Sequence, residues 1–266
     1  MLWQCSSDEY HADRKRFSNS LFNVLRDDGP AALADALFNG AGTPPTRAMT
    51  LGTALHCLCL EHPQFPSRFC LDCRDRFNMR KPAEKEQYQA ICAAERRTVL
   101  TAEEIRLLHE QAEAIGRHPR AAKAIYDADG ISEQTVVWED EETGVPLKAR
   151  LDRVSRKRRI IADLKRTESF GPKEWERESW ERRYHCQAAH YLDAARQEWP
   201  DVDWRFVFVV VSAARPVRVA VREPDADLLH LGWDENRKSI EQIAEMAANN
   251  SWWRVETFSA PTWARK

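Results

Sequence analysis

The stretch Leu147–Thr167, LKARLDRVSRKRRIIADLKRT, predicts a β-hairpin that gathers two carboxylates and a lysine. Its first arm alternates apolar and polar residues, its second arm is a short apolar run, and a basic tip separates them, as in a strand–turn–strand unit. With a two-residue loop at the tip, cross-strand pairing places Asp152 opposite Asp163. Side chains alternate between the faces of a strand, so Lys165 lies on the same face as Asp163. A hard divalent cation prefers such oxygen ligands, and the lysine would orient or deprotonate a water beside a phosphate.

The tip of this hairpin leaves two alternatives open. Its central pair, Lys157-Arg158, suits a primed two-residue turn poorly, because such turns prefer residues that tolerate positive φ. A longer loop would shift the register by one residue. An acid-x-Lys triplet is also expected about once by chance in a chain of this size. Taken alone, the hairpin is therefore more often a surface ion-pair cluster of small energetic value than a metal site, and the rest of the chain has to decide.

Composition describes a folded protein with room for a packed core. The chain has 266 residues, 43% of them hydrophobic and 31% charged, which excludes a disordered class and predicts one domain over residues 1–266. No apolar run approaches the roughly 20 residues of a membrane span, and the N-terminal sequence lacks a secretory apolar region. Seven scattered cysteines predict reduced thiols and a cytoplasmic location.

The formal net charge of −2 requires any nucleic-acid surface to be a local patch. The best candidate is the set of cations around the predicted acidic pair, although a basic hairpin tip is often only a solvated turn. This set is Arg150, Arg153, Arg156, Lys157, Arg158, Arg159 and Arg166.

Hydrophobic periodicity predicts an α/β architecture, with a helical N-terminal portion to about residue 130 and a mixed central β-sheet flanked by helices over 131–266. The expected helices are 17–28, 48–61, 82–97, 101–117, 119–128, 172–199 with a break near Ser179, and 225–249. The expected strands are 132–139, 147–155, 159–165, 204–212 and 216–222. The Ala-, Gly- and Pro-rich segment 29–45 is expected to be irregular with one helical turn.

A histidine in an apolar helical stretch adds a possible third ligand. His56 ends the motif Gly52-Thr-Ala-Leu-His56, in which Gly52 and Ala54 would let the helix approach a backbone closely. A lone histidine of this kind is more often a satisfied core residue. Beside two carboxylates, however, an imidazole would complete a Mg²⁺ or Mn²⁺ site.

Two further elements fit the hairpin. Glu133, at the start of the preceding strand, would pair with an arginine, bind a second ion, or hold Lys165 in place. Gln187 and Tyr191 are four apart and share one helical face, with two alanines between them that leave room for close packing. They are either an ordinary polar stripe or a polar pair directed at the site.

In this order the motifs resemble the PD-(D/E)XK nuclease superfamily, within it the RecB-like branch, and most closely the RecE-type, exodeoxyribonuclease VIII-like exonucleases of phages and prophages. The resemblance covers roughly residues 17–263. The motifs are Phe17-Ser-Asn-Ser20, Gly52-Thr-Ala-Leu-His56, Glu133, Arg150-Leu-Asp152, Asp163-Leu-Lys165, Gln187-x-x-x-Tyr191 and Pro261-Thr-Trp263.

The resemblance implies a role for each candidate residue. His56, Asp152, Asp163 and the Leu164 carbonyl would hold Mg²⁺, for which Mn²⁺ would substitute. Lys165 would position or activate the attacking water. The residues implied to support the site or the DNA strand are Gln187, Tyr191 and, least securely, Glu133. Arg166 departs from the family pattern, where a small hydroxyl residue is commoner after the lysine.

The resemblance also implies an activity, which is exonucleolytic hydrolysis of linear double-stranded DNA, 5′ to 3′, in recombination or phage DNA metabolism. A ring-shaped homo-oligomer and a single-strand annealing partner protein follow by analogy. Two alternatives remain: another RecB-like nuclease (repair or CRISPR-associated, preferring single strands), or a DNA-binding subunit of the same fold that does not cleave.

Two other features are better explained by packing than by chemistry. Cys70-x-x-Cys73, with Cys57 and Cys59 nearby, invites a metal-cluster interpretation, but no cysteine follows Cys186 to supply the remaining ligands. The C-terminal aromatics Trp252, Trp253, Phe258 and Trp263 are expected to pack on the core rather than stack on bases.

Overall fold

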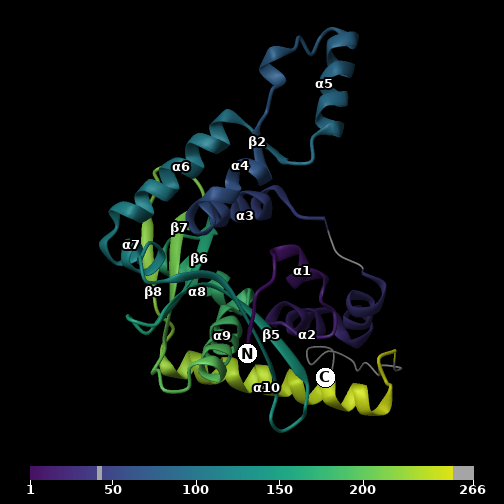
Figure 1. Cartoon of the computed structure of the whole chain (residues 1–266), viewed down its shortest axis with the longest axis vertical. Helices are drawn as coiled ribbons and strands as arrows, with labels where there is room; N and C mark the ends of the chain where they lie inside the picture. Colours follow the sequence, from purple (N-terminus) through teal and green to yellow (C-terminus); the bar gives the residue numbers. More distant parts are fainter. Residues whose placement is uncertain (41–43, 254–266) are drawn as a thin grey trace, which may run out of the picture.

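The computed structural model describes residues 1–40 and 44–253, and within them a six-stranded sheet lies between helical layers (Figure 1). Its strands are β1 Leu2–Trp3, β4 Ile131–Glu139, β5 Pro146–Ser155, β6 Ile160–Thr167, β7 Arg205–Ser212 and β8 Val219–Arg222. The main helices are α1 Ser7–Ala12, α2 Asn19–Ala34, α3 Arg47–Leu60, α6 Ala102–Arg117, α7 Pro119–Ile125, α8 Pro172–Glu181, α9 Tyr184–Glu198 and α10 Ala226–Asn249.

The sheet has the order β1-β4-β5-β6-β7-β8. All neighbouring pairs are antiparallel except β6 and β7, which run parallel and are joined by the α8–α9 crossover. Crossovers of this kind place helices on a face of the sheet. The predicted α/β class with a mixed central sheet is therefore confirmed.

Each face of the sheet buries its own apolar cluster. On one face α3, α6 and α7 pack on Ala162, Leu164 and the odd-numbered valines of β7. On the other face Trp175 of α8 and the alanine-rich side of α9 pack on Ile161, Phe206 and Phe208. Strands buried on both faces are near-continuous apolar runs, which explains the composition of β7.

The β5–β6 hairpin has the predicted register but a different turn. Ser155 pairs with Ile160 and Arg153 with Ala162, so the same register carried one residue further sets Asp152 opposite Asp163. The turn closes through Arg159 N donating to Arg156 O (3.2 Å), and in it only Arg159 has positive φ. Because the two central residues keep negative φ, the turn is not a primed one, and the poor Lys-Arg chemistry for that turn is irrelevant.

The N-terminal part is more helical than the sequence predicts. Helix α2 continues to Ala34 through a kink at Gly29 (φ 85°), and the π-helical turn η1, Asp35–Asn39, follows directly. The expectation of an irregular segment after residue 28 is therefore wrong as far as Asn39. The kink has a simple cause, because Gly29 takes a conformation open mainly to glycine and Pro30 restarts the helix.

Helix α1 was not predicted, although its capping box is legible in the sequence. Ser6 Oγ accepts from Glu9 N and the Glu9 carboxylate accepts from Ser6 N, which is the reciprocal pattern of a helix start. The buried Lys148 of β5 fixes α1 on the sheet, because its ammonium donates to Tyr10 O (2.6 Å).

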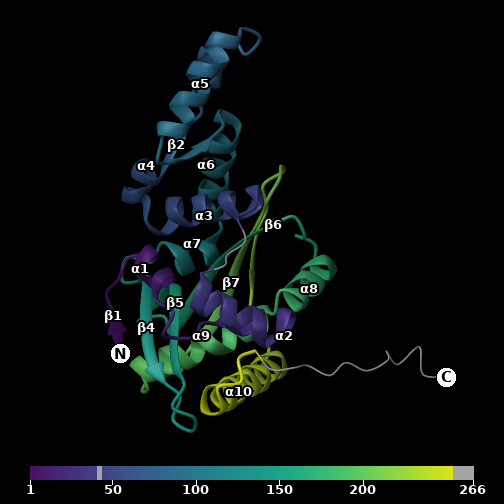
Figure 2. The same cartoon turned by 90° about the vertical axis from the view of Figure 1, so that its right-hand side faces the viewer.

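Two other boundaries differ from expectation. The predicted helix over 172–199 divides at Arg183, which has φ 52°, and not at Ser179. Between α3 and α6 lie η2 His62–Gln64, α4 Phe65–Arg68, η3 Arg74–Arg76 and a small parallel sheet of β2 Phe69–Leu71 and β3 Thr98–Leu100, which carries α5, Pro82–Ala94. This segment projects from the body (Figure 2). In the part of the chain that the structure describes, no helix is long and apolar enough to cross a membrane.

Helices α9 and α10 cross closely at Gly232, which predicts a strong effect of adding one methyl group. A Cβ at Gly232 would lie 2.4 Å from the His185 carbonyl oxygen, a backbone atom that cannot move alone. Gly232→Ala should therefore lower the free energy of unfolding by about 1–3 kcal/mol, measured by urea denaturation.

Gly116→Ala in α6 is the matched control, because its Cβ would meet Tyr126 at an ordinary 3.7 Å. That substitution should be neutral or stabilising by up to about 1 kcal/mol through helix propensity. Equal effects of the two substitutions would contradict the close crossing.

The β4–β5 hairpin is tied to α10 by a carboxylate, which predicts a pH dependence of stability. Arg237 Nη1 donates to Asp140 Oδ1 (2.9 Å), as does Thr143 Oγ1 (2.7 Å). Mainly through the Arg237 guanidinium, these bonds lower the Asp140 pKa from 3.8 to about 2. A depressed folded-state pKa gives stability that is full above the unfolded value and is lost as pH falls towards the folded one.

The stability difference between the wild type and Asp140→Asn should accordingly be largest above about pH 5 and shrink between about pH 4 and pH 2. Urea unfolding across that range measures it. A difference that stays constant with pH would show that the charge of Asp140 is not involved.

Candidate metal and catalytic site

The candidate site lies where β5 and β6 part. Their ladder runs from the hairpin tip to Arg153 and Ala162. Two residues beyond Ala162, Leu164 N donates to Asp152 Oδ2 (3.0 Å). The Asp152 carboxylate thus replaces a backbone acceptor. Because β5 and β6 diverge beyond this point, side chains can enter between them.

Helix α3 brings His56 to this point. His56 Nε2 donates to the Leu164 carbonyl (2.5 Å), and Nδ1 lies 3.3 Å from Asp152 Oδ2. His56 thus lies against Asp152, one of the two hairpin acids with which it was expected to share a site. The reason given for Gly52 is wrong, because a Cβ there would meet nothing within 4 Å. Gly52 lines the cleft and faces open space there.

Asp163 and Lys165 extend from the same face of β6, as strand alternation predicts. Lys165 Nζ lies 2.7 Å from Asp163 Oδ2, and Gln187 Nε2 of α9 donates to Asp163 Oδ1 (2.8 Å). The ammonium also lies 4.7 Å from the ring centre of Tyr184. Asp163 is only 1% exposed, and Lys165 and Gln187 each hold one of its carboxylate oxygens.

Glu133 adds a third acid in an unusual backbone conformation. It lies between the paired residues Ser132 and Gln134 of β4, and its φ is 53°. Positive φ in a strand costs of order 1 kcal/mol and persists at sites where the side-chain direction matters. Its carboxylate accepts from Arg150 Nε (2.7 Å), so it does not hold Lys165 in place, one of the roles considered for it. His56, Glu133 and Asp152 each offer a ligand atom within 4.8 Å of the others.

Charge crowding at the site shifts several protonation equilibria. Burial, followed by the neighbouring Asp163 carboxylate, raises the pKa of Asp152 from 3.8 to about 7. Burial opposes the charge of His56, yet Asp152, Asp163 and Glu133 outweigh it and raise the imidazole pKa. For Lys165 burial is again outweighed, chiefly by Asp163, so its pKa is raised and it stays an ammonium at neutral pH.

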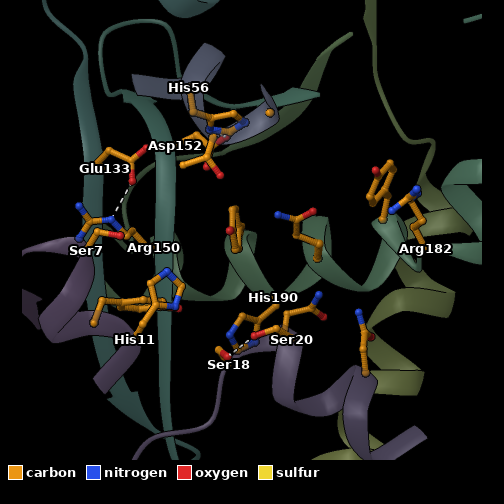
Figure 3. A pocket seen from close by; sticks show the side chains of 18 of the residues that line it. Ser7, His11, Ser18, Ser20, His56, Glu133, Arg150, Asp152, Arg182 and His190 are labelled. Carbon is orange, nitrogen blue, oxygen red and sulfur yellow. Dashed lines mark hydrogen bonds and ion pairs between the residues drawn. The ribbon is translucent and has the colours of Figure 1, made fainter. Parts of the chain in front are cut away.

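The site opens into a cleft of about 710 Å³. Figure 3 shows His56 and Asp152 at one end, the Glu133–Arg150 pair on the wall beside them, and Arg182 across the opening. Tyr191 and Gln187 of α9 both line it, as their spacing predicts. The remaining wall comes from α1, from the start of α2 and from the base of the projecting segment. Among these are Ser7, His11, Ser18, Ser20, Asp27, Glu61 and Arg68.

The predicted basic patch does not form around Asp152 and Asp163. Of the seven cations, only Arg150 lines the cleft. Lys157 and Arg158 pair with Asp129 and Asp127 at the hairpin tip. The others are placed as follows: Arg153 donates to Ser132 Oγ, Arg166 donates to Ala213 O, and Arg156 and Arg159 are exposed at the tip. Arg68 and Arg182, which line the cleft, have no sequence signal, because each reaches it through the packing of a helix end.

Comparison with known proteins places the chain in a family. Residues 18–255 match the family described as PDDEXK-like domain of unknown function (DUF3799). The chain belongs to this PDDEXK-like family. The predicted superfamily is thereby confirmed, and the RecE-type assignment within it stays a prediction.

Solved structures support the PDDEXK-like fold. A crystal structure titled "Putative exonuclease" from Eubacterium rectale superposes with a TM-score of 0.59 at 14% identity, covering 97% of each chain. The structure of SSO0001 superposes poorly, with a TM-score of 0.28 at 14% identity over 73% of this chain and 88% of that one. No curated protein sequence matches significantly.

The residues of this PDDEXK-like site fit a divalent cation. The donor set is two carboxylates, an imidazole and a backbone carbonyl, a mixture that suits Mg²⁺ or Mn²⁺. Asp163 Oδ2 is buried without a hydrogen bond of acceptable geometry, although the Lys165 ammonium lies 2.7 Å away. Burial first, and the Asp163 carboxylate second, raise the pKa of Asp152, and a bound cation would favour its charged form.

A second group of ligand types, His185, Cys186 and Glu235, lies between α9 and α10. Its carboxylate is already paired with the guanidinium of Arg183 (3.1 Å), a permanent cation that neutralises its charge. Among the described residues, no three-ligand group includes Cys70 or Cys73.

Proposed function

We propose that this protein is a divalent-metal-dependent deoxyribonuclease that hydrolyses DNA phosphodiester bonds. The main support is that His56, Asp152 and Leu164 contact one another, while the Asp163–Lys165 pair lies near enough for the Asp163 charge to act on both Asp152 and His56. A domain kept only for binding DNA has no chemical need for a buried carboxylate–lysine pair next to a second carboxylate of raised pKa.

Each residue of the candidate site has a definable task in this reaction. His56, Asp152, Asp163 and the Leu164 carbonyl would hold Mg²⁺, with Mn²⁺ as a substitute. The bound ion would supply Lewis acidity toward a phosphate oxygen and a more acidic water. Lys165, charged at neutral pH, orients that water and stabilises charge on the phosphate. Gln187 fixes the Asp163 carboxylate through Oδ1, and Tyr191 closes the wall behind it.

The finer assignment is an exonuclease acting from the ends of linear double-stranded DNA, 5′ to 3′. It is supported by the sequence resemblance to RecE-type enzymes and by the printed description of the Eubacterium rectale structure as a "Putative exonuclease". By the same analogy we propose a single nuclease domain over residues 1–266 that forms a homo-oligomer and works with a single-strand annealing protein in DNA recombination.

Degradation of linear duplex labelled at the 5′ or the 3′ end tests this function, with closed circular DNA as control and Mg²⁺ or EDTA present. The proposal predicts metal-dependent loss of linear DNA, a spared circle, and early release of the 5′ label. Early release of the 3′ label would reverse the polarity, and a cleaved circle would make the enzyme an endonuclease. Metal-independent binding without turnover on any DNA would contradict the nuclease assignment.

A further inference from the structure

A second groove, of about 620 Å³, lies beside the catalytic cleft along α8 and the start of α9. Aromatic side chains dominate it, with an arginine and several acids at its edge. The lining includes Trp175, Trp180, Tyr184, His185, Phe208, Arg222, Glu176, Glu223 and Asp225. None of the roles assigned above uses Trp175, Trp180 or Arg222.

Trp180 presents a flat aromatic surface in the lining of the groove. One face of its indole lies flat on the His185 ring, with the centroids 4.8 Å apart and the planes at 9°. His185 is 2% exposed, whereas Trp180 is 53% exposed. A large aromatic surface is therefore held rigidly by a buried ring and still presented to solvent. Little conformational entropy remains to be lost when a flat ligand stacks on it.

The groove and the cleft share a wall. Tyr184 lines both, and the Lys165 ammonium lies against its ring at 4.7 Å. Phe208, on the floor of the groove, also faces that ammonium, at 6.0 Å. A polymer whose phosphate lies beside Lys165 would therefore need only to cross Tyr184 for its next residues to enter the groove.

The charges of the groove select which part of such a polymer enters. Glu176, Glu223 and Asp225 line it; Glu223 is paired with Arg205 (2.6 Å), whereas the like charges of Glu176 and Asp225 repel phosphate at close range. Arg222, the one cation among the described residues that line the groove, donates to Phe170 O (2.7 Å) and lies 5.4 Å from the Trp175 ring centre, so its guanidinium is held against the wall. Flat, uncharged rings with amino donors suit these walls, and phosphates do not.

We infer that this groove receives unpaired nucleobases of the DNA strand held in the cleft, stacked on Trp180. The inference rests on the proposed nuclease function and adds a single-strand path to it. Stacking on an aromatic side chain accepts every base, because each base has a π-face. The groove would thus hold the strand next to the scissile phosphate without reading its sequence.

An abasic scan tests the contact directly. Single abasic sites are placed at each of the positions within about four nucleotides of the end of a short oligonucleotide. Binding is measured with Ca²⁺ in place of Mg²⁺ so that the strand stays intact. Stacking is worth about 1–3 kcal/mol per base, so one abasic position should weaken binding to the wild type about tenfold. In Trp180→Ala the same abasic site should cost nothing further.

Trp180→Phe and Trp253→Ala complete the experiment. The phenylalanine variant keeps part of the stacking surface and should show an intermediate loss. Trp253, 60% exposed and packed near Phe38, is a matched exposed tryptophan away from the groove, and its removal should leave the abasic pattern unchanged.

If every abasic site weakens binding to Trp180→Ala by the same factor as it weakens binding to the wild type, the inference is overturned, because no base would then contact the indole. This outcome is distinct from failure of the proposed function. If wild-type protein binds the oligonucleotide and shows coupling to Trp180 but never cleaves with Mg²⁺, the groove assignment holds and the nuclease assignment fails.

Discussion

Asp163→Asn should reduce Mg²⁺-dependent DNA cleavage about a thousandfold or more. The substitution keeps the shape of the side chain and an oxygen for Gln187, but removes the charge that faces both the cation position and Lys165. Interactions of a cation with the reacting phosphate are worth several kcal/mol, and each 1.36 kcal/mol is a factor of ten in rate. Initial rates on end-labelled linear duplex at saturating Mg²⁺ measure the effect.

Asp129→Asn is the control for this variant. Asp129 is an exposed acid paired with Lys157 at the hairpin tip, so its loss should leave the rate within a factor of two or so. Circular dichroism spectra should show that both variants fold. The spectrum of Asp163→Ala should likewise match that of the wild type. A rate for Asp163→Asn within tenfold of the wild type would remove Asp163 from the site.

Lys165→Met should lower the rate by about 10²–10⁴-fold, the range typical of a positioned proton-transfer or charge-stabilising group. Methionine fills the volume of the lysine stem but carries no ammonium. Since the pKa of Lys165 is raised, the wild-type side chain is charged throughout the neutral range. The loss should therefore appear in kcat at every pH between about 6 and 9 and not as a shift of the pH optimum.

Lys157→Met, in the same hairpin, separates this effect from general electrostatics. Lys157 is exposed and paired with Asp129, so it should change DNA affinity only slightly. Equal losses of kcat in the two lysine variants would mean that Lys165 acts through overall charge and not at the reacting phosphate.

Much of the site could be predicted because it depends on strand geometry. Two-residue periodicity placed Asp163 and Lys165 on one face, and hairpin register set Asp152 opposite Asp163. Helical periodicity likewise put Gln187 and Tyr191 on one wall. In each case the residues are close in sequence, so local geometry is sufficient.

The failures involve contacts between distant segments. The hairpin cations are neutralised by Asp127 and Asp129 after α7, which no pattern within the hairpin predicts. Gly52 faces open space, whereas Gly232, which sequence reasoning passed over, is the glycine that permits a close helix crossing. The cleft wall from α1 depends on a buried lysine of β5 that fixes this short helix to the sheet. The tail residues Phe258 and Trp263 lie outside the described residues.

His56, Asp152, Asp163 and the Leu164 carbonyl are proposed to hold a divalent cation. The most direct test is a crystal soaked with Mn²⁺ and measured at a wavelength where manganese scatters anomalously. One strong anomalous peak is expected in contact with these four residues, and it should be lost in Asp163→Asn. A peak only at His185, Cys186 and Glu235, or none within reach of Asp163 at millimolar Mn²⁺, would contradict this proposal.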